Sequence, residues 1–123
     1  MIVDDSSLIR QRLVAMLSRI EGVTVVGEAG TGAQALEKIV ALEPDVVTLD
    51  IMMSNGTGVE ALERIAKLES PPTCIVLTNY PYPAFRKRCL QLGAKHFLSK
   101  AAEFDRIPAI LEDMVAEQRG RGA

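Results

Sequence analysis

Five short apolar runs alternate along the chain with longer segments of helical periodicity, and this alternation restricts the fold more than any other feature. The runs are rich in Val, Ile and Leu and have the length of buried parallel strands, whereas the segments between them repeat apolar residues every three or four positions. We therefore predict strands at Met1–Val3, Val23–Val26, Asp45–Asp50, Thr73–Thr78 and Lys95–Leu98. The predicted helices are Ser7–Ile20, Ala33–Leu42, Val59–Leu68, Ala84–Leu92 and Phe104–Glu117.

This order predicts an α/β fold in which helices cover both faces of a parallel sheet. Five βα units fit the flavodoxin-like (βα)5 architecture, whose five-stranded parallel sheet has the strand order 2-1-3-4-5. Met1–Val3 would then be a central strand, although it is shorter than the usual ~5–6 residues. Either the chain was shortened at its start or the pairing of this strand is reduced.

The composition fits one small intracellular domain. The length of 123 residues supports a single core, and a net charge of −2 gives no electrostatic reason to expect nucleic acid or an anionic membrane as a partner. No apolar stretch approaches the ~20 residues of a membrane span, and the first residues do not resemble a signal peptide, so we expect a cytoplasmic protein. We expect the domain at residues 1–117 and a flexible tail, without apolar period, at 118–123.

Polar residues follow four of the predicted strands at the point where each ends: Asp4 and Asp5, Asp50, Thr78, and Lys100. Because ligands of open α/β sheets bind beyond the carboxyl ends of the strands, these side chains should share one edge. Three nearby carboxylates repel one another unless a proton or a cation intervenes, which predicts a Mg²⁺ site with phosphate as its companion. Lys100 can pair with a carboxylate or a phosphoryl oxygen, and Thr78 offers a hydroxyl between them.

Taken singly, each of these residues has a structural explanation as a turn former, helix cap or solvated surface charge. Their conjunction in one chain favours a functional explanation. A carboxylate that accepts a phosphoryl group becomes an acyl phosphate, and a divalent cation with a lysine ammonium supplies the charge neutralisation that such a transfer needs.

Five segments resemble the response-regulator receiver domains of two-component signalling: Ile2–Ser6, Gly27–Leu36, Pro44–Ile51, Ile75–Thr78 and Leu92–Lys100. They extend over nearly the whole chain. The resemblance implies a signalling domain rather than an enzyme. We expect a stand-alone receiver similar to the chemotaxis regulators, with a domain of a longer regulator or hybrid kinase as the alternative.

The resemblance also implies a role for each residue of the acid site. Asp50 corresponds to the phosphoacceptor, and Asp4 and Asp5 correspond to the acids of the Mg²⁺ site. The backbone carbonyl of Met52 is implied as a further metal ligand. The implied donor is a histidine kinase or a histidine phosphotransfer protein.

A switch is implied as well, with Thr78 as its hydroxyl, Phe97 as its aromatic residue and Lys100 as the counter-charge. A phosphoryl group adds charge and hydrogen-bond acceptors, so Thr78 would move toward it and Phe97 would enter the vacated space. The face formed by the fourth helix, fifth strand and fifth helix would then change for a downstream protein whose identity is unknown.

Three positions depart from the usual receiver pattern. Ser54 and Ala101 stand where proline is common, and Asn79 stands where a smaller residue is common. An alternative is therefore a receiver-like module that takes no phosphate and acts by protein contact alone.

A further alternative is a small dinucleotide-binding domain. Gly30, Gly32 and Ala35 match the glycine fingerprint between a strand and a helix, and Asp50 follows at a suitable distance. This interpretation leaves the acid pair, Thr78 and Lys100 without roles.

Overall fold

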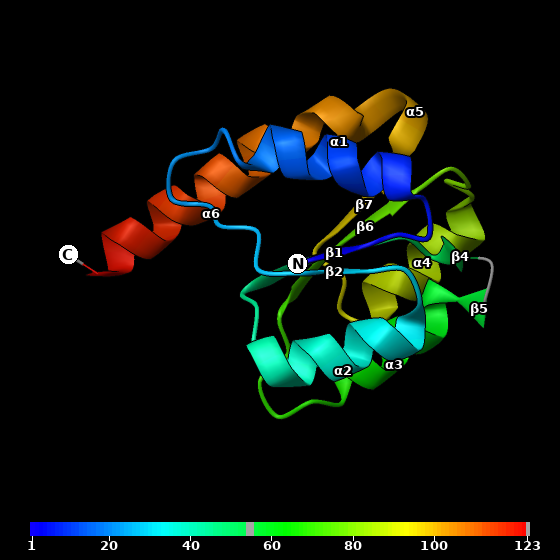
Figure 1. The fold of residues 1–123 in the computed structure, drawn as a ribbon. Helices are drawn as coiled ribbons and strands as arrows, with labels where there is room; N and C mark the ends of the chain where they lie inside the picture. The colour runs from blue at the N-terminus through cyan, green and yellow to red at the C-terminus, as the bar shows by residue number, and fades with distance from the viewer. Residues whose placement is uncertain (54–55, 123) are drawn as a thin grey trace.

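The main sheet has five parallel strands and confirms the predicted fold class. The computed structural model describes residues 1–53 and 56–122, with the backbone alone at 56–57 and 121–122 (Figure 1). The strand order is β2-β1-β3-β6-β7, which is 2-1-3-4-5 when the strands of this sheet are counted along the chain. These strands are β1 (Ile2–Val3), β2 (Glu28–Ala29), β3 (Val46–Leu49), β6 (Thr73–Thr78) and β7 (His96–Ser99).

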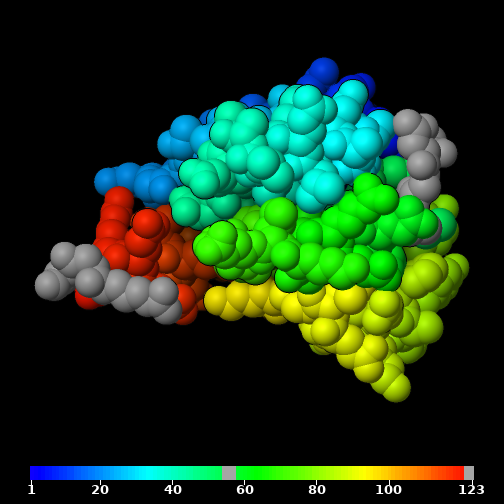
Figure 2. Space-filling model, turned by 90° about the horizontal axis from the view of Figure 1, so that it is seen from below, coloured from blue at the N-terminus to red at the C-terminus, as the bar shows by residue number. Residues whose placement is uncertain are grey.

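Helices cover both faces of the sheet (Figure 1). One layer contains α1 (Ser7–Leu17), α5 (Lys100–Glu103) and α6 (Ile107–Gly122), with the 3-10 turn η1 (Phe104–Arg106) between the last two. The other layer contains α2 (Gly32–Leu42), α3 (Gly58–Ala66) and α4 (Pro83–Gln91), which lie side by side in Figure 2. Among the helices that the structure describes, none is both long and apolar enough to cross a bilayer.

Two apolar clusters fill the space between the sheet and its helix layers, because successive side chains of a strand point to opposite faces. On β6, Cys74 and Val76 belong to the cluster beneath α2, α3 and α4, whereas Ile75 and Leu77 belong to the cluster beneath α1 and α6. A sheet buried on both faces explains why its strands are continuous apolar runs in the sequence.

The prediction of a strand at Val23–Val26 is wrong, because β2 is Glu28–Ala29. The segment keeps the burial pattern of a strand: Val23 and Val25 are partly buried and pack against the core, whereas Thr24 and Val26 are exposed. However, β1 pairs with Glu28–Ala29, and in the described structure no strand pairs with residues 23–26. The apolar alternation reports which side chains face the core, but a strand also requires a partner.

Two other segments differ from their predicted form. Residues 51–58, for which the sequence predicts neither helix nor strand, include the short antiparallel strands β4 (Met52–Met53) and β5 (Gly56–Thr57), and Ser54 lies outside the described residues. The helix predicted at Phe104–Glu117 is divided into η1 and α6. Residues 118–122, predicted to be a flexible tail, continue α6 as helix, so the boundary at Glu117 is not visible in the secondary structure.

Candidate functional site

Acidic side chains from two neighbouring strands meet at the carboxyl edge of the sheet. Asp4 and Asp5 follow β1, and Asp50 follows β3, which pairs with β1. One carboxylate oxygen from each of the three residues lies within 4.8 Å of the others. Asp4 and Asp50 are 1% and 4% exposed, whereas Asp5 faces solvent. We call Asp4, Asp5 and Asp50 the acid cluster.

Lys100 bridges the two buried members of the acid cluster. Its Nζ atom lies 2.7 Å from Asp4 Oδ2 and 3.1 Å from Asp50 Oδ2, and the three side chains are almost completely buried. One ammonium therefore serves two carboxylates. This sharing reduces the repulsion between them but leaves the cluster with a net negative charge.

The electrostatics favour a further cation at this edge. Burial raises the pKa of Asp50, and the negative charge of Asp4 acts in the same direction, against lowering contributions from the Met52 amide and Lys100. Burial by itself lowers the pKa of Lys100, but its hydrogen bonds and charge interactions with Asp4 and Asp50 outweigh burial and raise it. Lys100 thus keeps its proton, while the ionised form of Asp50 remains incompletely compensated.

A reciprocal helix cap fixes the backbone at Lys100. Ser99 is the N-cap of α5, and its hydroxyl accepts a hydrogen bond from Ala102 N at 3.3 Å. In return, Glu103 Oε1 accepts a hydrogen bond from Ser99 N at 3.2 Å. Such a paired cap defines the first turn of a helix. Lys100, the first residue of α5, is therefore held at the end of β7 with its side chain directed to the acids.

The backbone on the C-terminal side of Asp50 folds back against it. Met52 N donates to Asp50 Oδ1 at 3.0 Å, and Gly58 N donates to Ile51 O at 2.8 Å. A Cβ atom at Gly58 would lie only 2.1 Å from the Asp50 carbonyl oxygen, so no side chain fits there. Sequence reasoning did not single out Gly58, because a glycine at the end of a loop carries no sign of what approaches it.

Thr78 and Phe97, predicted to form the switch, are both buried. Thr78 ends β6 and accepts a hydrogen bond from Tyr80 N at 2.9 Å, and its hydroxyl hydrogen can still be donated. Phe97 packs in the apolar cluster beneath α2, α3 and α4. Its carbonyl oxygen accepts a hydrogen bond from Arg86 Nη1 of α4 at 3.4 Å, which connects β7 to that helix.

Arg10 supports the acid cluster without having been predicted. Its Nη1 donates to the carbonyl oxygen of Asp4 at 2.6 Å, and its Nε lies 3.3 Å from Glu28 Oε1 at β2. Arg10 thereby ties α1 to the ends of β1 and β2. In the sequence it looks like an ordinary surface arginine of an amphipathic helix, so no signal distinguished it.

The donor atoms of the acid cluster fit a hard divalent cation. Three carboxylates within 4.8 Å of one another form an all-oxygen set, and Mg²⁺ prefers oxygen ligands together with several water molecules. The backbone carbonyl of Met52 is the predicted fourth metal ligand. Met52 lies beside the acid cluster, since its amide donates a hydrogen bond to Asp50.

The glycine-rich segment is arranged differently from a phosphate cradle. Gly30 N donates to Gln34 Oε1 at 3.2 Å, and Gln34 N donates to the Thr31 hydroxyl at 3.1 Å. These amides, which would bind a dinucleotide phosphate, are used within the chain. The contacts therefore do not favour the dinucleotide interpretation.

Comparisons with known proteins agree on one family. The family model described as "Response regulator receiver domain" matches residues 1–112. The response regulator GacA of Pseudomonas aeruginosa is 32% identical over 119 residues, which are 97% of this chain and 56% of that protein. The first curated relatives are longer, and the chain spans 33% to 56% of their length.

Solved structures with the same fold also match. The response regulator domain of Thermotoga maritima CheB is 32% identical, with a TM-score of 0.81 over 94% of this chain and 91% of that one. CheY in a complex of CheX, CheY, BeF3 and Mg²⁺ from Borrelia burgdorferi is similar at 28% identity, with a TM-score of 0.77 over 89% and 86% of the two chains.

Proposed function

The chain belongs to the response-regulator receiver domains of two-component signalling, and we propose that its Asp50 accepts a phosphoryl group from a phosphohistidine. The observation that carries this proposal is the Lys100 ammonium held by Asp4 and Asp50 at the acid cluster. It supports the proposal because a positive charge beside an acceptor carboxylate favours the approach of phosphoryl oxygens.

In the proposed transfer, one Asp50 carboxylate oxygen attacks phosphorus while the bond from phosphorus to the imidazole nitrogen breaks. The electron pair of that bond returns to the imidazole, and an acyl phosphate forms on Asp50. Lys100 would pair with a phosphoryl oxygen. Attack by water would later restore the carboxylate and release inorganic phosphate.

We propose that Asp4, Asp5 and Asp50, with the backbone carbonyl of Met52, hold Mg²⁺. A divalent cation there would neutralise charge on the transferred group. The raised pKa of Asp50 supports this proposal, because it shows that burial destabilises the ionised carboxylate. A cation in addition to Lys100 would offset that destabilisation. Support also comes from the CheX, CheY, BeF3 and Mg²⁺ complex of a related chain.

For the output, we propose that Thr78 donates its hydroxyl hydrogen to the phosphoryl group and that the face of α4, β7 and α6 changes in response. The strand register supports a short connection from Thr78 to α4. Thr78 pairs with Ser99 in β7, and the carbonyl oxygen of Phe97 in the same strand accepts a hydrogen bond from Arg86 of α4. Phe97 already occupies a buried position in this structure.

The partners in this proposal are a histidine kinase or histidine phosphotransfer protein and a downstream protein of unknown identity. Neither nucleic acid nor a membrane is a proposed direct partner of this chain. Reaction with such a kinase would take place in the cytoplasm.

Intact-mass measurement after incubation with acetyl phosphate and Mg²⁺ tests the proposal. We expect the mass of one phosphoryl group to be added to the wild type, and no addition to Asp50→Asn or after chelation of the metal. Asp45→Asn is the matched control, because Asp45 is an exposed acid just before the same strand, away from the acid cluster. No addition to the wild type would favour the alternative of a module that acts by protein contact alone.

A further inference from the structure

The hydrogen bonds between β1 and β2 end beside the acid cluster. Ile2 N donates to Gly27 O at 3.1 Å, and Asp4 N donates to Ala29 O at 3.0 Å. If this parallel pattern went on by one more bond, the amide of Thr31 would donate to the carbonyl oxygen of Asp4. Thr31 is the N-cap of α2, so the chain leaves the sheet for the helix at this point.

The guanidinium of Arg10 donates to the carbonyl that the next strand bond would have used. Arg10 Nη1 lies 2.6 Å from Asp4 O. Gly30 borders this contact, because a Cβ atom there would lie 3.4 Å from Arg10 Nη1 and 4.0 Å from Asp4 O. A side chain of α1 thus completes the pairing of β1 where β2 ends.

Glu28 of β2 orients the guanidinium. Its Oε1 atom lies 3.3 Å from Arg10 Nε, and the Arg10 side chain is only 22% exposed. Because the N–H donors of a guanidinium are fixed in one plane, an ion pair at Nε also limits where Nη1 points. The contacts of Arg10 with Glu28 and Asp4 therefore act together.

The carbonyl that Arg10 holds belongs to the peptide bond between Asp4 and Asp5. Since that bond is planar, fixing its oxygen limits rotation on both sides and sets the direction of one side chain relative to the other. The buried carboxylate of Asp4 is also held by Ser6 N at 2.9 Å and by Lys100. Asp5 faces solvent, so its direction depends more on the backbone.

We propose that Arg10 is a positioning residue of the metal site. With Glu28 as its orienting partner, it fixes the peptide between Asp4 and Asp5 so that both carboxylates reach one divalent cation. This inference rests on the Mg²⁺ site of the proposed function, and it adds two residues outside the acid cluster. Residues that orient metal ligands in this way change metal affinity.

Charge alone predicts the opposite effect of Arg10. A positive group near the acid cluster repels a cation, so its removal would strengthen Mg²⁺ binding if Arg10 acted only through its charge. If Arg10 acts through the backbone of Asp4, its removal weakens binding. The sign of the change therefore distinguishes positioning from electrostatics.

Titration of the unphosphorylated chain with MgCl2, followed by backbone amide chemical shifts, tests the proposal. We expect the dissociation constant of Mg²⁺ to rise about tenfold in Arg10→Gln. Arg12→Gln is the matched control, because it removes the same charge from the same helix, and Arg12 lies over the Phe104 ring at 4.7 Å from its centroid. The control should keep nearly the wild-type constant. Thermal unfolding without Mg²⁺ checks that the variants fold.

Two further variants keep the overall charge constant. Arg10→Lys retains the positive charge but loses the planar fork, and it serves as well if Arg10→Gln does not fold; we expect weaker Mg²⁺ binding than in the wild type. The double variant Arg10→Gln with Glu28→Gln has no change in net charge. We expect it to bind Mg²⁺ no more tightly than Arg10→Gln, because Glu28 acts through Arg10.

Phosphorylation by acetyl phosphate supplies a second readout. The rate in Arg10→Gln should be low at limiting Mg²⁺ and return to the wild-type rate at saturating Mg²⁺. Equal or tighter Mg²⁺ binding in Arg10→Gln, or a rate that saturating Mg²⁺ does not restore, would overturn this inference and leave the proposed function standing. A wild type that binds no Mg²⁺ would overturn this inference together with the proposed metal site.

Discussion

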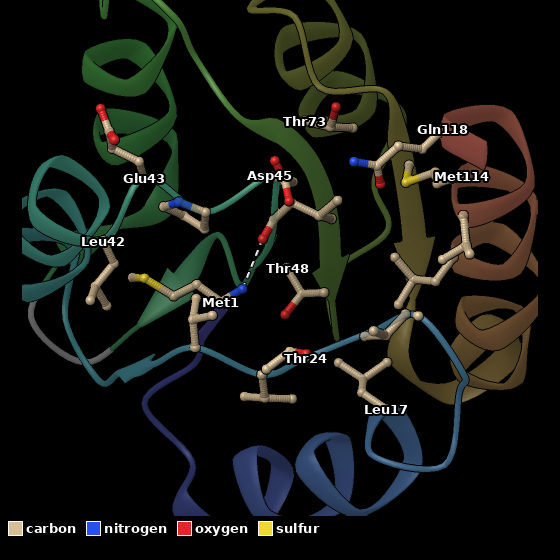
Figure 3. A pocket seen from close by; sticks show the side chains of 18 of the residues that line it. Met1, Leu17, Thr24, Leu42, Glu43, Asp45, Thr48, Thr73, Met114 and Gln118 are labelled. Carbon is tan, nitrogen blue, oxygen red and sulfur yellow. Dashed lines mark hydrogen bonds between the residues drawn. The ribbon is translucent and has the colours of Figure 1, made fainter. Parts of the chain in front are cut away.

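The two edges of the same sheet differ in how completely their buried polar groups are paired. At the carboxyl edge, Lys100 serves two carboxylates, both oxygens of Asp50 accept hydrogen bonds, and Thr78 accepts one from a backbone amide. At the amino edge, the hydroxyl of Thr48 is buried beside a cavity and has no hydrogen-bond partner among the residues that the structure describes (Figure 3). The contrast shows that the buried polar groups of the charged edge have more of their hydrogen bonds made, although burying a charge carries the larger desolvation penalty.

The largest expected effect comes from breaking the carboxyl edge at Lys100. Lys100→Met leaves Asp4 and Asp50 buried without their shared cation, and we expect the free energy of unfolding at pH 7 to fall by about 3–5 kcal/mol. Urea unfolding measures it, with Lys95→Met as the control, because Lys95 is an exposed lysine just before the same strand. Equal losses in the two variants would contradict the role of the buried pair.

The stability loss caused by Lys100→Met should depend on pH. In the wild type, the pKa of Lys100 is raised, so its contribution is fully present below the ordinary value of 10.5 and is lost as the pH rises through the raised value. In Lys100→Met, the pKa of Asp50 is expected to rise further, and protonation relieves the uncompensated charge. The deficit should therefore shrink between pH 7 and about pH 5. A constant deficit over that range would contradict this explanation.

A smaller effect is expected from crowding the backbone of the same edge. Gly58→Ala would place Cβ 2.1 Å from Asp50 O, which forces the chain on both sides to shift. We expect a loss of about 2–3 kcal/mol in unfolding free energy, measured by urea denaturation. Gly32→Ala is the control at the equivalent first position of a helix, where the nearest atom, Ala61 Cβ, lies 3.4 Å away. A comparable loss at Gly32 would contradict the steric argument.

The smallest effects are expected at two buried threonines, one at each edge of the sheet. Thr48→Val removes a hydroxyl that has no partner in the described part of the chain and should raise the free energy of unfolding by about 1 kcal/mol. Thr78→Val removes the acceptor of the Tyr80 amide and should lower it by about 1 kcal/mol. Thermal unfolding of the two variants measures both changes. A shift of the same sign in both would show that the edges do not differ in the way described.

The parts of the site that come from strand ends could be predicted from the sequence. Asp4, Asp50 and Lys100 follow apolar runs, and the parallel α/β arrangement then brings such positions to one edge. The helix periodicity likewise predicted most elements to within a few residues. These signals are local, so a single chain is enough to detect them.

The remaining features depend on which segments approach one another. Val23–Val26 has the alternation of a strand but pairs with no strand among the described residues, which no local pattern reveals. Gly58 is required by a backbone that lies beside it in space, and Arg10 is defined by the strand ends that it contacts. Such contacts follow from the assembled fold, and for that reason they were missed.

The shortness of β1 has a consequence for cooperativity. The register of β1 with β3 covers Ile2 and Val3, and Met1 adds bonds to Val46 O and from Thr48 N, whereas β3 pairs with β6 over Val46–Leu49. Few main-chain bonds therefore cross the boundary between β1 and β3, and we expect β1, β2 and α2 to separate there in a sub-global opening that costs less than global unfolding. Asp4 and Asp50 stand on opposite sides of that boundary. A cation bound between them would keep the two strands together, so binding of that cation would make unfolding of the whole domain more cooperative.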